Sequence, residues 1–339
     1  MHWSKLTKIT TAAVAIVLIA SLTACGSKPA GHEGSDPTIR LSLDWSTLIA
    51  YHAPIVLAEE EGIFEKHGVN VSQSFTAGSK DAVLAVGTNQ SDIAWADLST
   101  SAASILSGLP AKAIATVQAK NSQGLTVLED TTLNSAKDVV GLRIGSTPGG
   151  SDSTLIGAFL EKNGIAKDQV TIVNLPGNGK FAALMAGNVD AISGQVYYYV
   201  SSSVAEGKPA HGKSYSEMGV DTLDHGFVAN DQFLSAHPDA ATNFLAAYRE
   251  ALQKTIEDPA AACAKIAPLS DGALSVKACE TQLELWLPLV TPVDDPAWGT
   301  NDLTKWSDTI ATLKTFGGAT GSVEPTAMFT NDYLPKKVQ

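Results

Sequence analysis

The sequence has few of the signatures that mark an enzyme or a metalloprotein. It contains no GxSxG and no HExxH pattern, and the glycine-rich stretch GSTPGGS (145–151) lacks the lysine of a phosphate-transfer loop. The seven histidines are scattered, without the spacing of metal ligands. We therefore expect no catalytic residue, no metal and no cofactor, although missing motifs do not by themselves exclude an enzyme.

Positive charge is also scarce. Lys and Arg number 23 against 35 Asp and Glu, and no basic cluster follows Lys8, which argues against a nucleic-acid partner. Only three arginines occur: Arg40, Arg143 and Arg249. Arg143 falls inside a predicted strand and Arg40 near the start of another, so a strongly anionic ligand is disfavoured.

Cysteine is rare, and the first of the three cysteines closes a targeting signal. Lys5 and Lys8 precede an apolar run over 9–22, and Leu-Thr-Ala leads directly to Cys25. This pattern is typical of a bacterial lipoprotein signal, in which residues 1–24 are removed and Cys25 carries lipid. The run is short for a membrane span, which needs about 20 apolar residues. A retained anchor helix is the alternative.

A stretch rich in Gly, Ser and Pro follows over 25–37 and predicts a flexible tether. Signal and tether together place the protein on the extracytoplasmic face of the cell membrane, held there by the lipid on Cys25. In such an oxidising compartment the remaining pair, Cys263 and Cys279, is expected to form a disulfide between two helices. Two unconnected buried thiols are the alternative.

Strand and helix patterns alternate from Ile39 onward, which predicts parallel strands with helical crossovers. The length and the repeated units favour two α/β lobes with a hinge and a central ligand cleft. We expect lobe 1 over 38–120, lobe 2 over 121–225 and a helical return to lobe 1 over 226–339. The hinge crossings then fall near 119–130 and 219–230, and we expect a monomer.

Ligands of open parallel sheets bind beyond the carboxyl ends of the strands, where helix N-termini also point. This rule selects polar and aromatic residues that follow the predicted strands of both lobes. The candidate ligand-binding residues are Trp45, Tyr51, His52, Asp97, Ser99, Ser146, Thr147, Ser151, Asp152, Gln195, Tyr197 and Tyr198.

These candidates carry different weight. Trp45 offers a flat face for stacking, which is worth about 0.5–1.5 kcal/mol beyond area burial. His52 precedes an apolar helix and is equally well explained as a packed histidine. Asp97 and Asp152 are also explained as helix caps. Consecutive tyrosines on a helix point in different directions, so at most two of 197–199 face one cleft; Tyr197 is favoured, then Tyr198.

Four segments carry a family resemblance: LDW (43–45), YHAPIVLAEEEGIFEKHGVNV (51–71), SDIAWAD (91–97) and FTNDYLP (329–335). In them the chain resembles the solute-binding family of nitrate, sulfonate, taurine and thiamine-pyrimidine importers. The thiamine-precursor branch, which includes a fungal pyrimidine synthase, is the most similar. The resemblance implies a type II periplasmic-binding fold that delivers a small molecule to the permease of an ABC importer.

The resemblance also implies roles for particular residues. Trp45 would stack on a heterocycle, His52 would lie at the first helix entrance, and the loop over 146–152 would offer polar contacts. Two departures matter: six residues separate Trp45 from His52 where five are common, and Val200 stands where the branch tends to have a glutamate for an aminopyrimidine. The expected ligand is therefore a thiamine-pyrimidine precursor or a related heterocycle.

Two alternatives remain. One is a sulfonate-, nitrate- or taurine-type binding protein, which the few arginines disfavour. The other is a pyrimidine-synthase-like enzyme, which would be cytosolic. Its cysteine-rich motif is missing here, and the lipoprotein signal argues against it.

Overall fold

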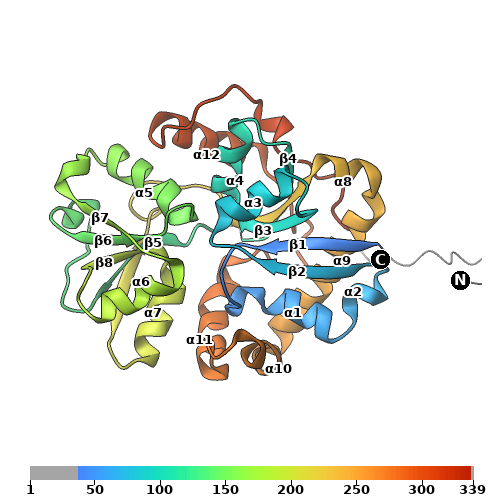
Figure 1. Cartoon of the computed structure of the whole chain (residues 1–339), viewed down its shortest axis with the longest axis horizontal. Coiled ribbons are helices and arrows are strands. Elements are labelled where there is room, and N and C mark those ends of the chain that lie inside the picture. The colour runs from blue at the N-terminus through green and yellow to red at the C-terminus, as the bar shows by residue number, and fades with distance from the viewer. Residues whose placement is uncertain (1–36, 119, 337–339) are drawn as a thin grey trace, which may run out of the picture. The chain divides into compact units, whose positions relative to one another are not determined.

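The computed structural model describes residues 37–118 and 120–336, and its strands form two five-stranded sheets that lie apart from each other (Figure 1). The predicted signal peptide, Cys25 and all of the tether except Pro37 lie outside the described residues. The first sheet has the order β2-β1-β3-β10-β4 and the second has the order β7-β6-β8-β5-β9. The strands are β1 (Thr38–Leu43), β2 (Asn70–Phe75), β3 (Ile93–Asp97), β4 (Ala111–Thr116), β5 (Gln123–Leu128), β6 (Arg143–Ser146), β7 (Thr171–Asn174), β8 (Ala191–Gln195), β9 (Ala210–Ser214) and β10 (His225–Asn230).

The two sheets repeat one pattern. β1 is parallel to β2 and β3, and β6 is parallel to β7 and β8, as the alternating sequence predicts. β10 and β5 are instead antiparallel to both of their neighbours, so the sheets are mixed and the expectation of parallel strands alone was wrong. The chain reaches each of these two strands directly from the other sheet, and it arrives at the edge where the parallel strands end. A strand that enters there must run in the opposite direction.

Two chain segments connect the sheets. One lies between Thr116 and Gln123 and the other between Ser214 and His225. Both overlap the crossings expected near 119–130 and 219–230. The first sheet with its helices is lobe 1, and the second sheet with α5, α6 and α7 is lobe 2.

Helices cover both sheets, and the C-terminal ones return to lobe 1. α9 has an apolar face that is buried on α1 and α2, while α11 contacts α7 and α12 contacts both α4 and α5, so these two helices touch both lobes. The helices are α1 (Ala53–Glu60), α2 (Ile63–Lys66), α3 (Ser79–Gly87), α4 (Leu98–Leu106), α5 (Ser151–Lys162), α6 (Gly177–Met185), α7 (Val196–Ala205), α8 (Asp231–Ala236), α9 (Pro238–Glu257), α10 (Pro259–Ile266), α11 (Val276–Trp286) and α12 (Leu303–Thr315). Over 37–118 and 120–336, none of them is long and apolar enough to cross a membrane.

The structure contains the disulfide expected from the sequence. Cys263 on α10 and Cys279 on α11 are bonded, with Cα atoms 5.6 Å apart, and both residues are fully buried. Pro268 and Asp271 lie in the connection between the two helices. The bond therefore fixes a helical hairpin whose buried faces belong to the core of lobe 1.

Candidate functional site

A cavity lies where the strand ends of the two sheets face each other. Its volume is about 30 Å³, enough for one or two water molecules. Lobe 1 and lobe 2 both contribute to its wall, so the lobes are closed on each other. The lining residues are Asp44, Trp45, Ile49, Tyr51, Gly78, Ser79, Gln123, Gly150, Ser151, Asp152, Lys180, Gly194, Gln195, Tyr198, Tyr199 and His225.

Asp44, the residue after β1, is the acceptor of a buried network on the lobe 1 side. Tyr51 Oη donates to its Oδ1 at 2.8 Å, and Ser79 Oγ and His225 Nε2 approach its Oδ2 at 2.8 and 2.7 Å. Burial would raise the pKa of Asp44, but the charge and hydrogen bond of His225, with help from His52, hold this pKa well below its ordinary value. Asp44 is therefore an ionised carboxylate in a closed cleft.

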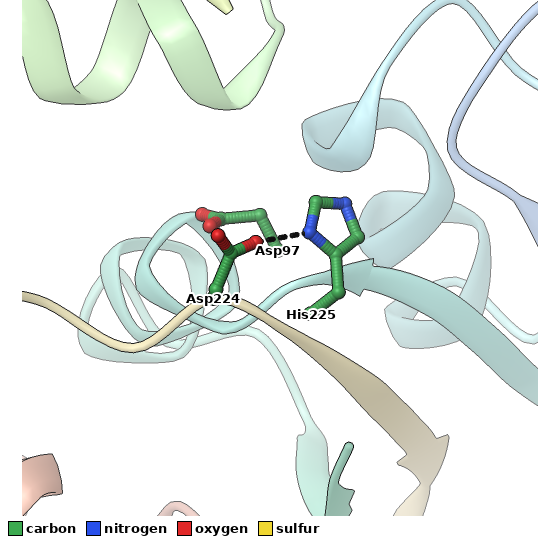
Figure 2. Close-up of side chains that lie close together, drawn as sticks. All are labelled: Asp97, Asp224 and His225. Carbon is green, nitrogen blue, oxygen red and sulfur yellow. Dashed lines mark hydrogen bonds and ion pairs between the residues drawn. The ribbon is translucent and has the colours of Figure 1, made fainter. Parts of the chain in front are cut away.

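His225, the first residue of β10, links this network to the crossing segments. Its Nδ1 contacts Asp224 Oδ1 (Figure 2), and Asp224 Oδ2 accepts from Gln118 Nε2 at 2.7 Å and from the Ser122 backbone N–H at 2.6 Å. Burial lowers the pKa of His225, but the carboxylates of Asp44 and Asp224 outweigh burial and raise this pKa well above its usual value. An imidazolium thus bridges two carboxylates, and neither of its nitrogens is free to act as a base.

Asp97 lies directly opposite His225 in the β3–β10 pairing. Its Oδ1 caps α4 by accepting from the Thr100 backbone N–H at 2.7 Å, and Ser99 Oγ donates to the same oxygen at 2.5 Å. Its Oδ2 is buried without a hydrogen-bond partner. Burial, reinforced by the charge of Asp224, raises the pKa of Asp97 to about 6.

A buried ion pair forms the lobe 2 wall. Lys180 Nζ donates to Asp152 Oδ2 at 2.8 Å and to the Ser193 carbonyl at 2.7 Å, and both charged side chains are at most 2% exposed. Ser146 Oγ and the Thr147 backbone N–H donate to the same oxygen of Asp152 at 3.1 and 2.9 Å. The carboxylate is thus held by the strand end and by α6 together.

Contacts across the cleft are close. Lys180 Nζ lies 5.6 Å from the ring centroid of Trp45, which belongs to lobe 1. A Cβ on Gly177 would come within 2.7 Å of the Trp45 ring, so glycine at the start of α6 lets the indole approach the backbone. The Lys80 backbone N–H donates to the Gly149 carbonyl at 3.1 Å. A ligand the size of a heterocycle therefore needs the lobes to separate.

Three lining residues carry polar atoms that are buried and have no hydrogen-bond partner: Gln123 Oε1, Gln195 Oε1 and Tyr199 Oη. Burying such an atom unpaired costs about 1–3 kcal/mol. Gln123 begins β5, whereas Gln195 and Tyr199 lie at the end of β8 and on α7. These three atoms are therefore available to form hydrogen bonds in the cleft.

The residues predicted from the sequence divide into two groups. Those that line the cavity are Trp45, Tyr51, Ser151, Asp152, Gln195 and Tyr198. Those that do not line it are His52, Asp97, Ser99, Ser146, Thr147 and Tyr197. Ser146 and Thr147 support Asp152 from behind, and Ser99 supports Asp97.

His52 and Tyr197 show why some candidates are not in the wall. His52 is fully buried under lobe 1, accepts the Ile49 backbone N–H at Nδ1 (3.3 Å), and has a pKa lowered by burial. It is the packed histidine of the alternative interpretation. Tyr197 packs in the lobe 1 core, while Tyr198 and Tyr199 face the cavity, because helix α7 starts at Val196 and turns the first tyrosine away.

Val200 does not face the cavity either. It lines a separate hollow of about 690 Å³ beside the crossing segments, together with Lys120, Tyr197 and His211. The cavity between the lobes has carboxylates of its own, Asp44 and Asp152. Val200 therefore does not line the cavity between the lobes.

Sequence reasoning missed several lining residues, chiefly Lys180, His225, Gln123 and Tyr199. Gln123 and His225 are the first residues after the two crossings, a position that could have selected them. Lys180 stands inside a predicted helix, and no sequence signal indicates which way it faces.

One further sequence pattern is explained by its place in the fold. GKPAHGKS (207–214) matches the spacing GxxxxGK[ST] of a phosphate-binding loop. The pattern needs a loop that opens a helix, but residues 210–214 form β9, which pairs with β5. The match is therefore not a phosphate-binding loop.

Known proteins resemble this chain in sequence and in fold. The sequence model described as NMT1/THI5 like matches residues 49–262. The 4-amino-5-hydroxymethyl-2-methylpyrimidine phosphate synthase of Schizosaccharomyces pombe is 24% identical over 222 residues, which cover 62% of this chain and 63% of that protein, just under two thirds of its length.

Two solved structures share the fold. The alkanesulfonate-binding protein SsuA of Xanthomonas axonopodis pv. citri, bound to MOPS, has a TM-score of 0.70 at 18% identity and covers 88% of this chain and 99% of its own. The periplasmic aliphatic sulphonate binding protein SsuA of Escherichia coli has a TM-score of 0.70 at 15% identity, with coverages of 89% and 94%. The predicted periplasmic-binding fold with two α/β lobes is thus confirmed.

Proposed function

We propose that this chain, which belongs to the NMT1/THI5-like family, is the extracytoplasmic solute-binding protein of an ABC importer. It is anchored by lipid on Cys25 and binds a thiamine-pyrimidine precursor or a related small heterocycle between its lobes, without chemical conversion. A permease in the membrane then receives the ligand.

The observation that carries this proposal is the composition of the cleft. One wall presents the indole of Trp45, and the other presents unpaired buried acceptors on Gln123 and Gln195. A flat ring that carries amino or hydroxyl donors satisfies both features, because its faces stack while its edge donates hydrogen bonds.

The charges favour a heterocycle over a sulfonate or nitrate. Within the described chain, Arg40 and Arg143 pair on the surface with Asp92 and Asp190, and Arg249 donates to the Val293 carbonyl. None of the three lines the cavity, where Lys180 is already paired with Asp152. A strong anion would therefore lack an uncommitted cation.

Closure supplies the mechanism. In the open form the ligand enters and stacks on Trp45, and the lobes then rotate about the two crossing segments. In the closed form the cavity is only about 30 Å³, so a bound ring takes space that Trp45 and Lys180 occupy here. The contacts between Trp45 and Gly177 and between Lys80 and Gly149 are the ones that the ligand must displace or accommodate.

The experiment is calorimetric titration of the purified protein with 4-amino-5-hydroxymethyl-2-methylpyrimidine and, separately, with MOPS. We expect saturable binding of the pyrimidine, much weaker binding of MOPS, and unchanged pyrimidine on recovery. Trp45→Ala is expected to lower the affinity at least tenfold, since tenfold corresponds to about 1.4 kcal/mol and stacking plus lost apolar contact exceeds this.

Val200→Ala is the matched control, because Val200 lines the separate hollow. Binding that depends on Val200 and not on Trp45 would move the ligand out of the cleft. Preferential binding of MOPS would favour the sulfonate alternative, and conversion of the pyrimidine would favour an enzyme.

A further inference from the structure

A positively charged group of the protein itself lies against the aromatic rings of the cleft. Lys180 Nζ is 5.6 Å from the ring centroid of Trp45 and 5.5 Å from that of Tyr199, and both distances are within the range of a cation–π contact, about 6 Å. The same nitrogen donates to Asp152 Oδ2 at 2.8 Å and to the Ser193 carbonyl at 2.7 Å. Aromatic faces arranged around a cation in this way are also the means by which proteins hold cationic ligands.

The contact between Lys180 and Trp45 depends on closure of the lobes, because Trp45 follows β1 in lobe 1 and Lys180 lies on α6 in lobe 2. In this closed form the cavity is only about 30 Å³, and both side chains belong to its wall. A ring that enters between Trp45 and Tyr199 must therefore displace the ammonium group. Lys180 and the ligand compete for one place.

Asp152 has an oxygen that is free for such a ligand. All three of its donors, Ser146, Thr147 and Lys180, reach Oδ2. Over 37–118 and 120–336, Oδ1 accepts no hydrogen bond, and Asp152 lines the cavity. Because an ionised carboxylate oxygen only accepts hydrogen bonds, its partner in the ligand must be a donor.

The lobe 1 wall has an excess of negative charge. Asp44, which lines the cavity, and Asp224 both pair with the one imidazolium of His225. In the described part of the chain, histidines are the only ion-pair partners of these two carboxylates. Burial lowers the pKa of His52, so its ring is neutral near pH 7. One imidazolium does not neutralise two carboxylates, and the remaining charge attracts a cation and repels an anion.

We propose that the ligand is a flat nitrogen heterocycle that carries a positive charge and an amino group, for example an aminopyridinium or a protonated aminopyrimidine. This inference rests on the proposed function, since it specifies the ligand of the same cleft. The charged ring lies against Trp45 and Tyr199, and its amino group donates to Asp152 Oδ1. Lys180 takes the place of the positive charge when the lobes close on each other alone.

The test uses a matched pair of probes, 4-amino-1-methylpyridinium and 4-methylaniline. The two have the same shape and the same amino group, but only the first is charged near neutral pH. Calorimetric titrations of the purified protein are made at physiological ionic strength, where charges on the protein surface are largely screened. We expect one site per chain, and we expect the pyridinium to bind at least tenfold more tightly than 4-methylaniline. Trp45→Ala should weaken binding of the pyridinium at least tenfold.

Two variants of Lys180 test the competition. Lys180→Met removes the ammonium group, whereas the matched control Lys180→Arg keeps a positive charge at the same position. We expect the affinity for the pyridinium to rise at least tenfold in Lys180→Met, a gain that unfolding cannot produce, and not to rise in Lys180→Arg. The affinity for 4-methylaniline should change much less in either variant.

Three results would overturn the inference: no binding of the pyridinium, binding of 4-methylaniline that is equally tight or tighter, or equal pyridinium affinities in Lys180→Met and Lys180→Arg. The first two need only the wild-type protein, so they decide the matter even if a variant does not fold. Binding of the pyridinium without binding of 4-amino-5-hydroxymethyl-2-methylpyrimidine would count against the proposed ligand alone. Binding of that pyrimidine without a preference for the pyridinium would count against the present inference alone.

Discussion

Removal of Lys180 tests the buried ion pair on the lobe 2 wall. In Lys180→Met the side chain keeps about the same length, but the cation–π contacts of Nζ with Trp45 and Tyr199 are lost and Asp152 loses the Nζ donor at 2.8 Å. Asp152 retains the hydrogen bonds from Ser146 and Thr147, yet its charge is left without a counter-charge in a site that is at most 2% exposed. Breaking a buried pair in this way costs about 3–5 kcal/mol.

The double variant Asp152→Asn with Lys180→Met supplies the comparison. It loses the same cation–π contacts, but it removes the stranded charge and keeps an acceptor for Thr147, so the further loss is limited to hydrogen bonds worth about 1 kcal/mol each. We expect it to be more stable than Lys180→Met by about 2 kcal/mol. The assay is urea unfolding followed by circular dichroism, with free energies of unfolding from linear extrapolation and unchanged m values.

Two results would refute this reasoning. First, a decrease of less than about 1 kcal/mol in the free energy of unfolding of Lys180→Met would be typical of a solvent-exposed ion pair. The closed arrangement of the lobes would then not be the most stable one in solution. Second, equal decreases in the free energy of unfolding of the single and the double variant would mean that the buried carboxylate of Asp152 does not need Lys180 as its counter-charge.

Three further predictions concern the hairpin, the surface and the cleft. Replacing both Cys263 and Cys279 by serine removes a bond that closes a loop with a sequence separation of 16, and we expect the free energy of unfolding to fall by about 3 kcal/mol. Wild-type protein whose disulfide has been reduced should be as unstable as this variant; a variant that is clearly less stable than reduced wild type would contradict a loop-closure origin. The hydrogen bond from Arg143 lowers the pKa of Asp190, so this pair stabilises the fold above the ordinary aspartate pKa and the contribution disappears as pH falls through the lowered value. Wild type should therefore exceed Asp190→Asn by less than about 1 kcal/mol near pH 7, because the pair is partly exposed, and by nothing in strong acid; a difference that grows on acidification would have the wrong sign. Gly177→Ala should weaken pyrimidine binding several-fold, since its Cβ would stand 2.7 Å from Trp45, whereas Gly157→Ala, whose Cβ meets nothing within 4 Å, should not; equal affinities in titrations of the two variants would exclude closure onto Trp45.

Much of the fold was predictable because it is local. β1 and β3 show strand patterns in their sequence, and the 20 residues of α9 show a single apolar face. β9 is not predictable from its sequence because Ala-His-Gly-Lys-Ser has no alternating apolar pattern, and it becomes a strand only by pairing with β5. The antiparallel direction of β5 and β10 likewise depends on where the chain crosses between sheets.

Among the residues that line the cavity, only those that lie close to the end of a strand could be predicted from the sequence. Trp45, Asp152 and Gln195 satisfy that rule and line the cavity. The meeting of Asp97 with His225 joins residues 128 positions apart through the pairing of β3 with β10. Neither that contact nor the inward direction of Lys180 is encoded in a local pattern, because tertiary packing decides both.

The most direct test of ligand capture is a reversible lock on the two lobes. Thr100 on α4 and Thr154 on α5 belong to different lobes, and their hydroxyl oxygens are 3.4 Å apart, so we choose these two positions for a pair of cysteines that is oxidised to a disulfide. With the bond formed before ligand is added, calorimetry should detect no binding of 4-amino-5-hydroxymethyl-2-methylpyrimidine, and mild reduction of that bond should restore it. Equal affinity in the locked and the released protein would contradict capture between opening lobes.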